Sequence, residues 1–177
     1  MRTVTDKLDL IAFLAALCLF LSTVEYVIPK PVPFLRFGLA NLPILISLNY
    51  LSVPSLLLLI LLKVLGQALV QGTFFSYVFL FSLTGSITGG LFMILLSRIL
   101  GRHISLIGLS VLGALASNLA QLLLAVHLLF GRNGWLIAPF LIGIGLVTSC
   151  LLGYFAENFV RASRWVRQAL AVNHSRK

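Results

Sequence analysis

Two basic side chains and several amides are the residues of this chain that could bind a ligand. Arg36 and Asn41 lie directly after a proline-rich run, and Lys63 lies near the middle of an otherwise apolar stretch. A charged side chain inside a membrane-spanning segment costs a few kcal/mol or more, so its presence points to a function. Extension of Lys63 toward the membrane surface is the alternative interpretation. Cations with neighbouring amides favour an anionic or strongly polar ligand.

Lys63 begins a polar stripe on its predicted helix. Gln67 and Gln71 follow at intervals of four residues, so the three side chains lie on one face. Thr73 comes next, in a loop where it can cap the following helix or help backbone N–H groups contact an anion. The stripe predicts one wall of a ligand pocket, with a purely structural role as the alternative.

A second group of amides lies on the predicted helix at about 104–130. Asn118 and Gln121 are three residues apart and therefore share a face. Their predicted depth in the membrane matches that of Lys63, which predicts a cavity shared by the two helices. Side-chain amides that only join neighbouring helices are the alternative.

The acidic residues do not favour catalysis by this chain. It has four carboxylates, and no two are predicted to lie together at membrane depth. A carboxylate-bound Mg²⁺ site for diphosphate chemistry is therefore hard to build. The sequence has no metal-spaced cluster of histidine and cysteine and no phosphate-binding glycine loop. We expect no catalytic residue, no metal and no cofactor.

The composition predicts an all-α integral membrane protein, because 60% of the residues are hydrophobic and only 10% are charged. Apolar runs of about 20 residues can cross a hydrocarbon core of about 30 Å, and helices satisfy their own backbone there. We expect one domain over residues 1–177, a six-helix transmembrane bundle. The predicted spans are about 8–28, 38–51, 53–71, 74–97, 104–130 and 134–160, of which the second is short enough to cross only partly.

The basic residues predict that both termini are cytoplasmic, in the inner membrane of a prokaryote. Nine of them fall on the side of the termini and three on the opposite side, so the Arg36 loop faces outward. The net charge of +9 does not indicate nucleic acid. Much of it lies in the tail 161–177 beside a helix end, which is typical of contact with membrane lipid.

Small residues recur at four-residue spacing on several predicted helices. Ala12 and Ala16 share one face of the first helix, where they allow close packing within the bundle or docking of a partner protein. Gly85 and Gly89 have the same spacing on the fourth segment and predict close contact inside the bundle.

Three motifs resemble the Gx transporter family, which is also labelled heptaprenyl diphosphate synthase component I. They are Arg36-Phe-Gly-Leu-Ala-Asn41, Gly72-Thr-Phe-Phe-Ser76 and Ile104-Ser-Leu-Ile-Gly-Leu-Ser-Val-Leu-Gly-Ala114 with Asn118 and Gln121. The resemblance covers roughly residues 10–155, and this chain has Ser117 where the family motif leads us to expect a histidine.

The architecture is also similar to that of the S-components of energy-coupling factor transporters. In those proteins an Ala-x-x-x-Ala face on the first helix docks a transmembrane coupling subunit, and Ala12 and Ala16 occupy a matching position. The resemblance implies a substrate-binding subunit of an energy-coupled importer, working with a coupling subunit and ATPases. A small polar or anionic ligand, related to a prenyl phosphate, a quinone or a flavin, would enter from the outer face.

Two other functions stay open. One is a non-catalytic accessory component of a heptaprenyl diphosphate synthase or of a quinone or flavin redox system, with that enzyme as the partner. The other is a membrane-embedded enzyme, which the missing acids disfavour.

Overall fold

The computed structural model describes residues 4–28 and 37–163, and every regular element in these ranges is helical. Short 3-10 or π turns (η1 to η4) adjoin the α-helices. The α-helices are α1 (Val4–Val27), α2 (Leu42–Ser47), α3 (Val53–Val70), α4 (Tyr77–Ile99), α5 (Leu106–Ala125) and α6 (Ala138–Ala162). The turns are η1 (Leu39–Asn41), η2 (Gly101–His103), η3 (Val126–Phe130) and η4 (Gly131–Ile137).

Within residues 4–28 and 37–163, five helical segments are long and apolar enough to cross a membrane, which makes the chain a multi-pass membrane protein. They are Leu8–Val27, Val53–Val70, Tyr77–Ile99, Leu106–Phe130 and Asn133–Ala162. Each coincides with a predicted span to within a few residues. Arg36 and the tail beyond residue 163 lie outside the described residues.

The predicted span 38–51 is wrong as a single helix. Gly38 has a left-handed backbone with φ of 87°, and the 3-10 turn η1 follows it. The α-helix α2 then has only six residues, so it extends about 9 Å along its axis. It is too short to cross a membrane, and it is buried among the other helices instead of facing lipid.

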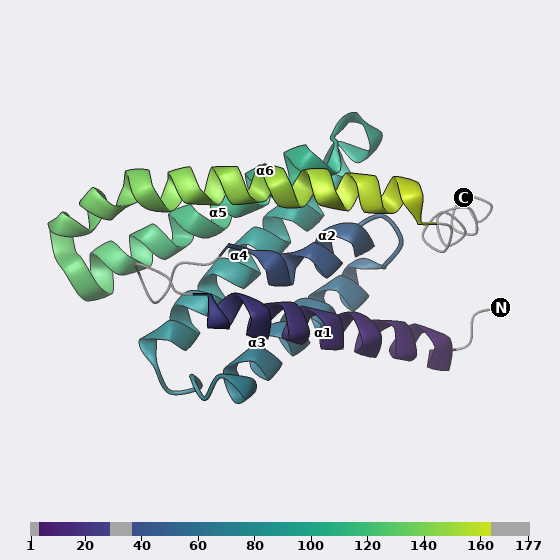
Figure 1. Cartoon of the computed structure of the whole chain (residues 1–177), viewed down its shortest axis with the longest axis horizontal. Coiled ribbons are helices and arrows are strands. Elements are labelled where there is room, and N and C mark those ends of the chain that lie inside the picture. Colours follow the sequence, from purple (N-terminus) through teal and green to yellow (C-terminus); the bar gives the residue numbers. More distant parts are fainter. Residues whose placement is uncertain (1–3, 29–36, 164–177) are drawn as a thin grey trace.

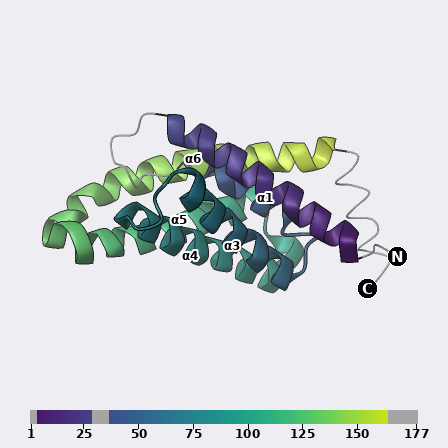
Figure 2. The same cartoon turned by 90° about the horizontal axis from the view of Figure 1, so that it is seen from below.

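The long helices form a bundle in which α5 packs between α4 and α6, while α1 packs against α3 (Figure 1). The short α2 contacts both α1 and α6 and lies between them in Figure 1. The start of α1 and the end of α6 lie at the same end of the bundle, as Figure 2 also shows. The main apolar core includes Leu14, Cys18, Ile44, Leu56 and Leu109.

Glycines bring neighbouring helices close together, and for Gly89 this is the close contact that its spacing predicts. A Cβ atom on Gly89 of α4 would lie 2.9 Å from the carbonyl oxygen of Gly113 on α5. A Cβ atom on Gly153 of α6 would lie 2.6 Å from the Cα atom of Ile107 on α5. Side chains larger than hydrogen at these positions would collide with backbone, so the glycines set the helix separations.

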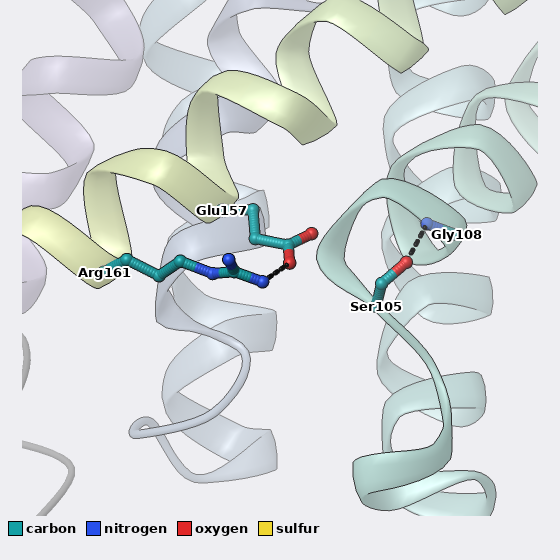
Figure 3. A network of polar contacts seen from close by, with 4 residues as sticks. All are labelled: Ser105, Gly108, Glu157 and Arg161. Carbon is teal, nitrogen blue, oxygen red and sulfur yellow. Dashed lines mark hydrogen bonds and ion pairs between the residues drawn. The ribbon is translucent and has the colours of Figure 1, made fainter.

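Where α5 begins and α6 ends, the polar contacts join residues three or four apart on the same helix (Figure 3). Glu157 pairs with Arg161 one turn later at 2.5 Å, which is the usual i,i+4 spacing of a helical ion pair. The Ser105 Oγ atom accepts a hydrogen bond from the Gly108 N–H at 3.1 Å and caps the start of α5. These contacts fix helix ends and do not reach the polar interior.

Candidate functional site

A small polar cavity lies inside the bundle and brings together side chains from six helical elements. Asn41 of η1, Lys63 of α3 and the α5 residues Asn118 and Gln121 all line it. Its volume is about 40 Å³. The two polar groups predicted on separate helices therefore meet at one place. Glu25 of α1 and Ser86 of α4 also line the cavity, together with Gly145 and Thr148 of α6.

Lys63 is the cation among the described residues that line this cavity, and only 3% of its surface is exposed. Its Nζ atom donates a hydrogen bond to Asn41 Oδ1 and another, of 3.1 Å, to Ser86 Oγ. A buried ammonium needs such partners, because removal from water without them is very costly. The two bonds join α3 to η1 and to α4. The Lys63 side chain therefore does not extend to the membrane surface, which was the alternative interpretation.

Glu25 is a site residue that sequence reasoning missed. Its carboxylate accepts hydrogen bonds from the Phe37 N–H at 2.7 Å and from the Leu39 N–H at 3.0 Å. An acid in the last turn of a helix opposes the helix dipole, and two charge-assisted bonds offset this cost. The residue is 5% exposed. An ionisable group buried in an apolar helix was the available signal for its role.

The Glu25 bonds hold the segment that leads into η1. Gly38 lies between the two donors, and its left-handed backbone lets the N–H groups of Phe37 and Leu39 reach the same carboxylate. Phe37, Gly38 and Ala40 line the cavity, so this segment forms one of its walls. Glu25 therefore positions a wall of the site as well as contributing a negative charge.

The Gln121 amide has an unpaired acceptor, although the side chain is 2% exposed. Its Nε2 atom donates to Ser117 Oγ at 3.5 Å, while its Oε1 atom has no hydrogen-bond partner. A buried polar atom without a partner costs about 1–3 kcal/mol. The neighbouring amide is satisfied, since Asn118 Nδ2 donates to the Leu141 carbonyl at 3.2 Å. The Gln121 amide is thus the group on α5 that a ligand or a water molecule could satisfy.

The rest of the predicted stripe does not line this cavity. Gln67 accepts a hydrogen bond from Ser82 Oγ at 3.5 Å, which joins α3 to α4. Gln71 donates to the Ser22 Oγ atom at 3.1 Å, which joins α3 to α1. The carbonyl of Thr73 accepts from the Ser76 hydroxyl within the loop at 2.8 Å. The structure gives these residues contacts between helices and within a loop.

The Ala12 and Ala16 pair lies on the exposed face of α1, away from the core. Ala15, by contrast, is buried in the core. Phe13 and Phe20 are also exposed and lie beside the pair on α1. Within the described residues this face is open to lipid or to another protein.

Substituting Glu25→Gln should loosen the segment that it holds. An amide keeps one acceptor and turns a donor toward the second backbone N–H, so one charge-assisted bond is lost and the other weakened. We expect hydrogen exchange at the Phe37 and Leu39 amides to accelerate about tenfold to hundredfold. Glu157→Gln is the matched control, because its carboxylate bonds a surface arginine instead. Unchanged exchange in Glu25→Gln would show that the carboxylate does not hold this segment.

The cavity offers binding groups and no evident centre for metal chemistry. Among the described residues, no group of three histidine, cysteine or acidic side chains could hold a metal ion. The described residues that line the cavity supply one ammonium, one carboxylate, side-chain amides and hydroxyls from six elements. This set can orient a small polar group through several hydrogen bonds at once.

The comparisons with known proteins identify a family. A family model described as heptaprenyl diphosphate synthase component I matches residues 14–159. No curated protein and no solved structure shows a significant match. The matched region begins within α1, ends within α6 and includes every residue of the described cavity. The chain belongs to the heptaprenyl diphosphate synthase component I family.

Proposed function

We propose that this chain is a membrane-embedded binding subunit that captures a small polar or anionic group in the Lys63 cavity. The observation that carries the proposal is the convergence of a buried ammonium and an unsatisfied glutamine amide on one cavity, from different helices. Purely structural polar residues are expected to satisfy one another. A spare hydrogen-bonding atom beside a buried cation favours a ligand.

The charges of the cavity restrict the ligand. Lys63 attracts a negative group, while Glu25 in the same cavity opposes additional negative charge. Electrostatic interactions are strong in a poorly hydrated interior, so each further charge matters. The balance favours a head group with one negative charge, or a neutral polar one, over a diphosphate.

The size of the cavity implies that it must open for a large ligand. A volume of about 40 Å³ holds roughly three water molecules. A head group of a few atoms fits with small adjustments, whereas a whole flavin does not. Opening would separate the η1 wall, which Glu25 holds, from α5 and α6.

Transport would need energy from partner proteins. The sequence has no phosphate-binding loop for ATP, so an importer would need a coupling subunit with ATPases. We propose the exposed Ala12 and Ala16 face of α1 as the surface for that subunit, since small residues allow close helix contact. In this proposal both termini are cytoplasmic, as the basic residues indicate, and the cavity loads from the outer side.

The family description supports a second function. Its name links the chain to a component of heptaprenyl diphosphate synthase, and the described residues hold no acidic metal cluster for that chemistry. The chain would then be a non-catalytic membrane component bound to a catalytic partner.

One purification would separate these functions. The full chain is isolated from its native membrane in mild detergent, and its bound proteins and small molecules are identified by mass spectrometry. A polar or anionic small molecule, recovered with a coupling subunit and ATPases, is the expected result. Recovery of a synthase without a small molecule would instead establish the accessory function and refute the importer.

A further inference from the structure

An apolar groove adjoins the polar cavity. It has a volume of about 290 Å³ and is lined by Ile28, Phe37, Leu39, Thr148, Leu151 and Leu152. Phe37 and Thr148 line the polar cavity as well. The two spaces are therefore neighbours that share two wall residues, one space polar and the other almost entirely apolar.

The groove faces the lipid side of the bundle. Leu151 lies on α6, within a segment long and apolar enough to cross a membrane, and 64% of its surface is exposed. Ile28, at the end of α1, is exposed as well. A molecule dissolved in the membrane can therefore reach the groove from the side, without passing through water.

Phe37 lies where the two spaces meet. Its backbone N–H is held by Glu25, so the residue is fixed relative to the charged end of the cavity. The Thr148 hydroxyl donates to the Ile144 carbonyl at 2.9 Å, so its hydrogen is used within α6. The boundary therefore consists of an aromatic residue and a threonine whose hydrogen-bond donor is already engaged.

We propose that the polar cavity and this groove form one site for an amphiphile, a molecule with a small polar or singly charged head and an apolar chain. The head binds among Lys63, Asn118 and Gln121, and the chain lies in the groove beside Phe37 and Leu151. The ligand enters sideways from the membrane between the end of α1 and α6. This inference rests on the proposed function and names its class of ligand.

A larger apolar groove between α1, α2 and α6 does not carry the same argument. Its volume is about 660 Å³, but it shares no residue with the polar cavity. A head group at Lys63 would not place its chain there directly. Ordinary membrane lipid suffices to fill that groove.

The test uses straight-chain carboxylates from butanoate to dodecanoate as probes, with the full chain in phosphatidylcholine nanodiscs. Leu151→Trp fills the groove, and Val147→Trp is the matched control. Val147 lies one turn earlier on α6, is 62% exposed and does not line the groove. Dissociation constants are measured by calorimetry. Partitioning of the probe into the nanodisc is common to all variants, so it cancels when the dissociation constant of each mutant is divided by that of the wild type.

We expect Leu151→Trp to leave butanoate binding unchanged and to weaken dodecanoate binding about tenfold. The reason is that the bulky indole overpacks the groove that the long alkyl chain would occupy. Val147→Trp should change neither constant. In each variant the dissociation constant, divided by that of the wild type, could instead be the same for short and long probes. That result would overturn the amphiphile site while leaving a head-group site in place. Absence of any binding that depends on Lys63 would overturn the proposed function as well.

Discussion

Replacing Lys63 with methionine is expected to weaken carboxylate binding about hundredfold while the chain stays folded. Methionine has a similar length and no charge, so it removes the attraction for an anionic head and the hydrogen bonds of the ammonium. Loss of one partner from a buried, hydrogen-bonded charge contact costs about 2–5 kcal/mol. The measurement is octanoate binding in phosphatidylcholine nanodiscs. The fold should survive, because a buried charge is itself expensive in a membrane.

Gln67→Leu is the control for this result. Gln67 lies one turn from Lys63 on α3 and is also buried, but its hydrogen bond is to Ser82 and it does not line the cavity. It should bind octanoate like the wild type. Equal losses in both variants would mean that disturbed helix packing, and not the cavity, explains the effect. Unchanged binding in Lys63→Met would refute the site.

Replacing Gly153 with leucine is expected to be the most destabilising substitution that the structure suggests. Its Cβ atom would lie 2.6 Å from the backbone of Ile107, so α5 and α6 would have to move apart. Overpacking of a tight contact costs about 1–3 kcal/mol or more, and backbone cannot relax as a side chain does. We expect loss of the monodisperse peak in size-exclusion chromatography, or a much lower thermal midpoint.

Gly143→Leu provides the comparison on the same helix. A Cβ atom there has no neighbour within 4 Å, so the substitution should leave the thermal midpoint near that of the wild type. If both variants were equally stable, the close approach of α5 and α6 would not be needed for the fold. If both were unstable, loss of glycine from α6 would matter more than the contact.

The meeting of polar residues from α3 and α5 at one cavity was predictable from their depth in the membrane. Lys63, Asn118 and Gln121 are polar residues at similar distances along apolar helices, and such residues turn toward the interior of a bundle. The full stripe was not predictable in the same way. Residues four apart drift by about 40° per step around a helix, so Gln71 is turned well away from Lys63. The structure accordingly directs Gln71 to α1.

The hydrogen-bond partners of Glu25 and the shape of the second segment were beyond the sequence patterns. Glu25 acts through two backbone N–H groups more than ten residues later, a contact that no local periodicity encodes. The second segment is apolar enough to suggest a span. Its interruption comes from the left-handed Gly38, the 3-10 turn after it, and a turn in which the Leu51 N–H bonds the Ser47 carbonyl. Tertiary burial then holds six helical residues in place.

The short α2 has a consequence for how the protein is made. A helix of six residues leaves most of its backbone groups without helical partners, and a membrane offers no water to satisfy them. The Arg98 side chain of α4 donates to the Leu51 carbonyl at 2.9 Å, just beyond α2, and α2 packs against α6. Both supports are synthesised after α2. The ribosome therefore releases this segment before its final surroundings exist, and the binding cavity is completed only once the last helix has been inserted.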